Sequence, residues 1–222
     1  MAQVKHMIAV AALVGVGAGV AWAQQGPPQF PDMTFFVSSK GGPDGANFGG
    51  LEGADRHCQT LAQAAGAGAK TWRAYLSTQA AGGGAAVNAR DRIGKGPWKN
   101  TKGVEVAASV DDLHKNNKLN IENSMAENGR MVPGRFFIGN QHDILTGTQA
   151  DGAAFPAGED KTCGNWTKNG EGSAIVGHSD RLGLNESAEA KSWNSAHATR
   201  GCSLAQLTPT GGTGLLYCFA AN

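Results

Sequence analysis

The feature that most constrains this chain is its set of four cysteines, which lie far apart at Cys58, Cys163, Cys202 and Cys218. In an oxidising compartment such cysteines pair into disulfides, and each crosslink fixes which distant segments lie together. Four cysteines allow three connectivities, and the residues alone leave all three open. The segment Cys-Gly-Asn-Trp, which begins at Cys163, indicates a crosslink covered by a large aromatic ring.

The N-terminus has the pattern of a secretory signal peptide at residues 1–23. Lys5 and His6 precede an apolar run from Met7 to Val20, and Ala-Trp-Ala at 21–23 forms a small-x-small cleavage site. The run is too short for a membrane span. An uncleaved anchor or a buried helix is the alternative interpretation. We therefore expect a secreted or periplasmic protein, with two disulfides and no transmembrane segment after cleavage.

Composition favours one globular domain over residues 33–222, preceded by a tether at 24–32 that is rich in Gly, Pro and Gln. The chain has 222 residues, and its 41% hydrophobic content is enough for a real core. The 33 glycines indicate many tight turns and long irregular connections. The net charge is +1 and the basic residues are scattered, which argues against a nucleic-acid partner.

Apolar periodicity predicts a mixture of helices and strands. Apolar residues recur every three or four positions over 51–65, which predicts an amphipathic helix with Cys58 on its buried face. Ser109 and Asp112 resemble a capping box that opens a second helix running to about Asn128. The predicted strands cover 33–38, 71–78, 135–139, a short segment after a turn at 142–147, and 214–220.

Several segments together resemble a known superfamily. They are the helix with Cys58, Trp-Arg-Ala-Tyr-Leu-Ser at 72–77, Arg-Phe-Phe-Ile at 135–138 with His-Asp-Ile-Leu at 142–145, Cys-Gly-Asn-Trp at 163–166, and residues 212–220. In these segments the chain resembles the C-type lectin-like fold, most closely its endostatin-like branch, and exported bacterial proteins described as lectins.

The resemblance covers roughly residues 35–222 and implies an α+β domain. In such a domain two antiparallel sheets and two helices support a long irregular loop region that binds ligands. The resemblance also implies a nested disulfide pairing, in which Cys58 bonds to Cys218 and Cys163 bonds to Cys202.

Candidate binding residues lie in the loop between the two inner cysteines. They are His178, Asp180, Arg181, Trp193, Asn194 and His197. Of these, His178, Asp180 and His197 are acceptable zinc ligands if folding brings them together. The alternative is a loop network in which Asp180 or Arg181 satisfies buried backbone groups.

The usual calcium site of sugar-binding members is not expected here. Those members use a proline triplet in the long loop and a Trp-Asn-Asp triplet, and this chain has no such proline triplet between Cys163 and Cys202. Its nearest match to the second triplet ends in Ser195, which lacks the carboxylate that a hard cation prefers. We therefore predict no metal or other cofactor, with calcium and zinc as the alternatives.

The tryptophans divide into two groups. Trp72, Trp98 and Trp166 are predicted to pack in the core, whereas Trp193 fits the surface and the core equally well. An exposed Trp193 beside Asp180 and His197 would favour stacking on a sugar ring, and a buried one would weaken that interpretation.

The chain lacks the common catalytic motifs. It has no Gly-x-Ser-x-Gly, His-Glu-x-x-His or phosphate-binding loop, and paired cysteines leave no free thiol. His142 and Asp143 form a pair without a recognisable nucleophile, so we expect them to cap a turn. The predicted function is non-catalytic binding of a glycan or polysaccharide through the loop between Cys163 and Cys202. The alternative is an envelope protein-interaction or structural module without sugar affinity.

Overall fold

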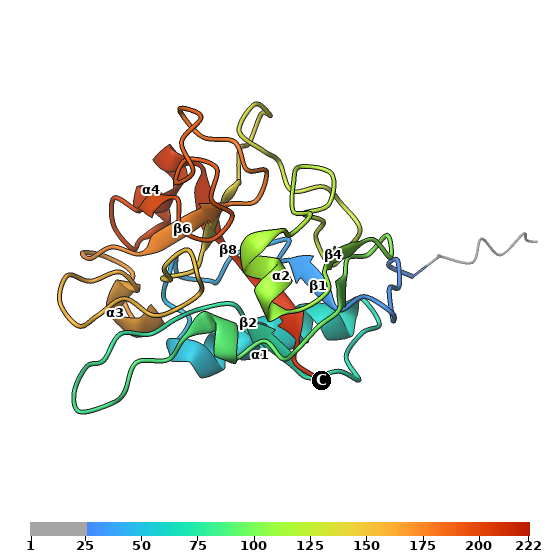
Figure 1. Ribbon diagram of the computed structural model, residues 1–222, viewed down its shortest axis with the longest axis horizontal. Helices are drawn as coiled ribbons and strands as arrows, with labels where there is room; N and C mark the ends of the chain where they lie inside the picture. Colours follow the sequence, from blue (N-terminus) through green and yellow to red (C-terminus); the bar gives the residue numbers. More distant parts are fainter. Residues whose placement is uncertain (1–25) are drawn as a thin grey trace, which may run out of the picture.

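The structure, a computed structural model, describes residues 26–222 (Figure 1), so the predicted signal peptide lies outside the described residues. Residues 26–29 of the predicted tether are exposed. Phe30 packs against the core, and its backbone N–H donates to the Ala65 carbonyl at 2.7 Å. Within residues 26–222, no helix has the length and apolar composition that a membrane span requires.

The fold is α+β, and its main sheet is built around the C-terminal strand β8 (Gly212–Ala220), which runs through the centre of the molecule (Figure 1). The strands of this sheet, in spatial order, are β1 (Phe35–Val37), β8, β5 (Asp143–Leu145), β6 (Ile175–His178) and β7 (His197–Ala198), and β2 (Trp72–Ala74) also pairs with β8. A separate two-stranded antiparallel sheet contains β3 (Trp98–Lys99) and β4 (Glu105–Ala107).

The main sheet is mixed, whereas we predicted only antiparallel sheets. β5 runs parallel to β8, and all other strand pairs among the described residues are antiparallel. A parallel pair needs a long crossover between its strands, and the irregular segment between β5 and β8 supplies that crossover.

β8 is buried on both faces, which explains its uninterrupted apolar sequence. Leu216 and Cys218 point into one core, which α1 (Gly50–Ala64) covers. Leu215, Tyr217 and Phe219 point into a second core on the opposite face. The three predicted core tryptophans are buried, two in the first core and one in the second, and they are Trp72, Trp166 and Trp98.

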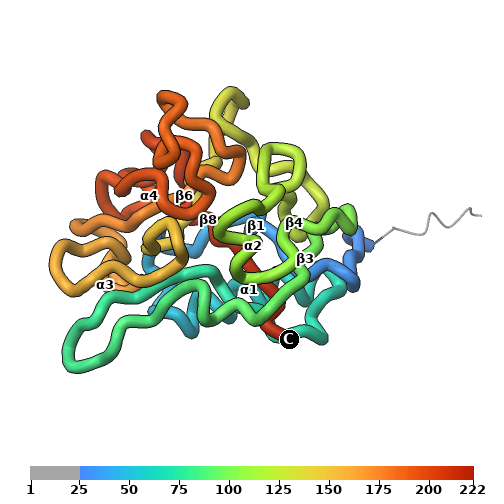
Figure 2. The backbone as a smooth tube through the Cα atoms, viewed as in Figure 1, coloured from blue at the N-terminus to red at the C-terminus, as the bar shows by residue number. Residues whose placement is uncertain are grey.

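Both disulfides pair as predicted. The Cys58–Cys218 bond joins α1 to β8, which lie side by side along the chain trace (Figure 2). The Cys163–Cys202 bond closes the long irregular segment. The crosslinks therefore hold together segments separated by 160 and 39 residues, respectively.

The second predicted helix is much shorter than expected. α2 (Val110–Lys115) begins where predicted, with the Ser109 hydroxyl accepting from the Asp112 N–H, but it ends at Asn116. Beyond that point the side chain of Asn117 accepts from the Leu119 N–H, so asparagine side chains compete with helical hydrogen bonds.

The remaining helical elements are short. They are the 3-10 turns η1 (Ala89–Asp91) and η2 (Thr208–Thr210), the turn α3 (Cys163–Trp166) and α4 (Leu204–Leu207). In α3 all four residues have positive φ, so this Cys-Gly-Asn-Trp segment is a left-handed turn. The Trp166 indole N–H donates to the Ser77 carbonyl at 2.8 Å, which holds the turn against the segment after β2.

The strand predicted at 135–139 is a loop in the structure. The Phe137 N–H donates to the Gly134 carbonyl, and the Gln141 N–H donates to the Pro133 carbonyl. These hydrogen bonds stay within the loop 133–141 and do not pair it with a neighbouring strand. Local β propensity is therefore overridden by turn geometry. As a result, Phe136 and Ile138 are exposed.

Candidate functional site

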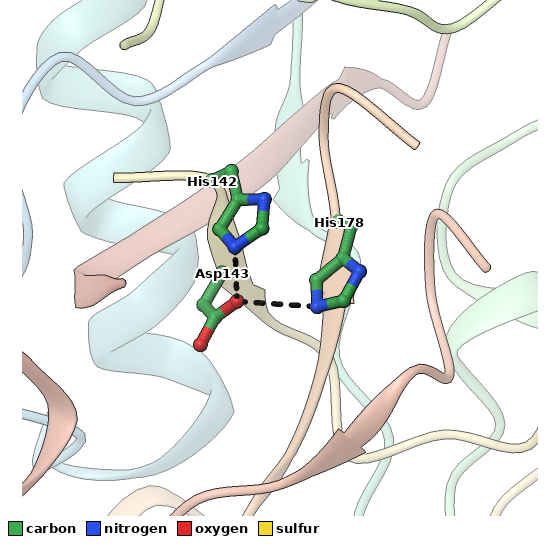
Figure 3. Close-up of side chains that lie close together, drawn as sticks. All are labelled: His142, Asp143 and His178. Atoms are coloured by element: carbon green, nitrogen blue, oxygen red, sulfur yellow. Dashed lines mark ion pairs between the residues drawn. The ribbon is translucent and has the colours of Figure 1, made fainter. Parts of the chain in front are cut away.

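Three strand ends bring a group of imidazoles and a carboxylate together. Asp143 begins β5, His178 ends β6, and these two residues face each other in the antiparallel register. His197 begins β7 opposite Val176, which lies two residues before His178 and therefore on the same face of the sheet. His142 directly precedes β5 and turns back toward Asp143 (Figure 3).

The geometry centres on one oxygen atom, Asp143 Oδ1. The Nε2 atoms of His142, His178 and His197 lie 3.2, 3.4 and 3.5 Å from it. We call these four residues the His–Asp cluster. His142, Asp143 and His178 are buried, whereas His197 is 37% exposed at its side chain.

The opposite nitrogen of each ring in the His–Asp cluster faces an oxygen atom. His178 Nδ1 lies 2.7 Å from the Ala190 carbonyl, and His197 Nδ1 lies 3.1 Å from the Ala198 carbonyl. Because a carbonyl only accepts hydrogen bonds, these Nδ1 atoms carry the protons. His142 Nδ1 similarly faces Asp180 Oδ1 at 3.0 Å. A ring with its only proton on Nδ1 would present an Nε2 lone pair to Asp143, and a ring protonated on both nitrogens would present an N–H.

Several buried polar atoms of the His–Asp cluster have no hydrogen-bond partner in the described part of the chain. Among residues 26–222, both carboxylate oxygens of Asp143 and the Nε2 of His178 are buried without a hydrogen-bond partner. Buried polar atoms are nearly always paired, so an unpartnered group of this kind calls for an explanation. A buried carboxylate ringed by imidazole nitrogens is satisfied by a cation between them, either protons on the rings or a metal ion.

The pKa values favour negative charge at the two carboxylates. Burial acts to raise the pKa of Asp143, but the imidazoles of His178 and His197 outweigh burial and lower it to about 2. Burial also acts to raise the pKa of Asp180. The neighbouring His142 and two backbone N–H groups outweigh burial, so the pKa of Asp180 is lowered. Asp143 raises the pKa of His197, against the effect of burial. The His–Asp cluster therefore attracts positive charge.

A cleft of about 980 Å³ opens beside the His–Asp cluster. His142, His178 and His197 contribute to its wall, together with the loop 133–141 and residues 184–190. Its other polar lining residues include Arg135, Asn140, Asn185, Glu189 and Arg200. This size falls within the range of small-ligand sites.

The structure separates the three residues that we considered as zinc ligands. His178 and His197 meet, but at Asp143 rather than at Asp180. Asp180 is buried and accepts from the backbone N–H groups of Arg135 and Leu182, as the alternative loop network predicts. Its contact with His142 makes it a supporting group behind the His–Asp cluster.

The other predicted binding residues do not line the cleft. Trp193 is only 3% exposed and packs between Tyr75 and Tyr217. Asn194 is buried, and its side-chain amide donates to the Tyr75 hydroxyl at 3.0 Å. Arg181 reaches Asn117 at 3.3 Å. Burial of Trp193 weakens the hypothesis that this residue stacks on a sugar.

Sequence reasoning missed Asp143 and His142 as partners of the two loop histidines. We expected this pair to cap a turn, yet both side chains are buried at the start of a central strand. A buried Asp directly before the apolar residues Ile144 and Leu145 was the available signal, because charged side chains rarely occupy such positions unpaired.

No protein-family model matches the chain, and no curated protein matches it.

Proposed function

We propose that the protein is an exported, non-catalytic binding domain of the C-type lectin-like kind, closest to the endostatin-like branch. In this proposal the cleft beside the His–Asp cluster recognises a glycan or another surface polymer without the usual calcium site. The observation that carries the proposal is the position of Phe136, which is 81% exposed and lines a cleft with many polar side chains.

An exposed aromatic ring among planar polar groups suits a sugar. A pyranose ring has an apolar face that packs on an aromatic surface, and its hydroxyls pair with amide and guanidinium groups. Phe136 supplies the aromatic surface, and the Arg135 guanidinium lies 6.0 Å from the centre of its ring. Asn140 and Arg200 line the same cleft and supply further hydrogen-bond donors.

The fold and the crosslinks support the proposed family. The nested disulfides, the helix carrying Cys58 and the closing strand with Cys218 match the expected arrangement. Two disulfides are also compatible with a secreted or periplasmic location. Among residues 26–222, no hydroxyl hydrogen-bonds to the imidazoles of His142, His178 or His197, which favours binding over nucleophilic catalysis.

A second candidate function is the docking of an envelope protein. Phe137, Ile138 and Leu184 are exposed apolar residues close to Phe136 along the cleft and its loop. Contiguous exposed apolar residues often mark protein-interaction sites. An apolar partner segment would bury this group more completely than a sugar would.

A glycan array tests the first candidate directly. The protein with both disulfides formed is screened once with calcium and once with a chelator. We expect binding that is unchanged by the chelator. Replacing Phe136 with Ala should weaken binding roughly fivefold, because aromatic contacts of this kind contribute about 1 kcal/mol. The control is Val104→Ala, which removes an exposed apolar side chain away from the cleft.

The outcomes separate the candidates. Equal binding by the Phe136→Ala and Val104→Ala variants would place the glycan elsewhere on the molecule. No glycan binding in either condition would overturn the first candidate. The second candidate then predicts that an envelope protein is crosslinked by a photoreactive group placed at Ile138 and not by one placed at Val104.

A further inference from the structure

We infer that the His–Asp cluster is a zinc site, in which the Nε2 atoms of His142, His178 and His197 and the Oδ1 of Asp143 are the ligands. This inference does not rest on glycan binding, because it concerns the ligand atoms rather than the cleft. It gives a role to buried acceptor atoms that have no partner among the described residues.

The distances from Asp143 Oδ1 fit zinc coordination, and the ligand atoms of His142, Asp143 and His178 all lie within 4.8 Å of one another. Zinc binds imidazole nitrogen and carboxylate oxygen at about 2.0–2.2 Å, usually with four ligands at the corners of a tetrahedron. The edge of such a tetrahedron is about 1.6 times the bond length, or roughly 3.2–3.5 Å. The three separations from Asp143 Oδ1 are 3.2, 3.4 and 3.5 Å, so they match tetrahedral edges.

The surroundings of the cluster have the features of a metal site's outer shell. Histidines that bind metals usually donate their second N–H to a carbonyl or carboxylate, which fixes the ring and its tautomer. All three rings meet this condition, through Ala190, Ala198 and Asp180. A Zn²⁺ ion with two carboxylates, Asp143 as ligand and Asp180 behind His142, would be electrically neutral.

The ligand types select the metal. Calcium and magnesium prefer oxygen ligands, whereas imidazoles suit zinc and its neighbours in the first transition row. Sulfur ligands are ruled out, since all four cysteines are in disulfides.

One ring must turn for all four ligands to meet. The rings of His142 and His178 are nearly parallel, with an angle of 4° and centroids 4.4 Å apart (Figure 3). A metal lies in the plane of each ligating imidazole, so rotation of one ring about its Cβ–Cγ bond is required. The His197 ring is inclined by 59° to that of His178, with centroids 5.1 Å apart.

The test is zinc binding by chelator-treated, disulfide-intact protein, measured by calorimetry and by metal analysis after dialysis. We expect one zinc ion per chain and a rise in unfolding temperature on zinc addition. X-ray absorption at the zinc edge should show nitrogen and oxygen ligands without sulfur. These readouts report the metal itself and do not depend on any activity.

Variants assign the ligands. His197→Ala should weaken zinc binding at least roughly 100-fold and leave the apo fold intact, because His197 is partly exposed. Asp143→Asn removes the central charge and should also abolish tight binding. The matched control is His57→Ala on α1, which removes an imidazole outside the His–Asp cluster and should leave zinc affinity unchanged.

Two results would overturn the inference. One is chelator-treated protein that takes up no zinc at micromolar concentrations. The other is equal zinc affinity in the parent protein and the His197→Ala variant. If zinc binds and the glycan array is negative, only the proposed glycan function fails. If the array is positive and zinc does not bind, only this inference fails.

Discussion

Removing each disulfide separately tests how the two crosslinks divide the stability of the fold. Both pairs are fully buried, so replacing both cysteines of a pair with alanine changes similar chemistry at each site. In the loop-entropy model, a crosslink spanning 160 residues contributes about 5 kcal/mol and one spanning 39 residues about 4 kcal/mol. The Cys58/Cys218 variant should therefore be less stable by about 1 kcal/mol.

The two variants should also differ in where structure is lost. Loss of Cys58–Cys218 releases α1 from the central strand β8, so the whole domain is weakened. Loss of Cys163–Cys202 releases the long loop, while α1 and β8 keep their packing. Urea unfolding followed by tryptophan fluorescence measures the first effect, and amide hydrogen exchange measures the second.

Specific results would refute this reasoning. The entropy argument is wrong if removing Cys163–Cys202 costs as much free energy of unfolding as removing Cys58–Cys218. The structural argument is wrong if the Cys163/Cys202 variant loses exchange protection equally in β8 and in the loop. Peptide mapping without reduction serves as the control, since a Cys58–Cys163 linkage would contradict both arguments.

Two further predictions concern the interior. Gly147→Ala should destabilise the protein by roughly 2–4 kcal/mol in urea unfolding, because φ is 61° and a Cβ would lie 2.7 Å from the Trp166 ring. Gly82→Ala, with a φ of 58° and open space around it, should cost only about 1–2 kcal/mol, and equal losses would contradict the packing argument. Tyr75 and Tyr217 are the two tyrosines of the chain, and burial raises the pKa of both well above 10. Their contribution to stability is complete below pH 10 and falls as pH rises further, so absorbance at 295 nm should report tyrosine ionisation only together with unfolding.

Local patterns were enough to predict the elements that form the frame. The three- and four-residue spacing around Cys58 predicted α1, and the uninterrupted apolar run at the C-terminus predicted the buried strand β8. These predictions succeeded because helix and strand periodicity follow from backbone geometry, which each segment carries in its own residues. The disulfide pairing came from the resemblance, since spacing allowed three connectivities.

Predictions failed where short-range hydrogen bonds opposed propensity. The segment 135–139 has strand-forming residues, yet its backbone groups close a loop with Gly134 and Pro133. The helix after Ser109 ends early because asparagine side chains bind the backbone. In both cases a few specific contacts outweighed an average preference.

The sequence by itself determined that the chain has two crosslinks, a buried C-terminal strand and an amphipathic helix against it. It also supplied the two histidines of the loop, His178 and His197, as candidate ligands. Only the tertiary structure decided what they face, because His178, His197 and Asp143 come from three strands whose order and register depend on long-range pairing. A one-residue shift in that register would turn Asp143 to the opposite face of the sheet, and the cluster would not form.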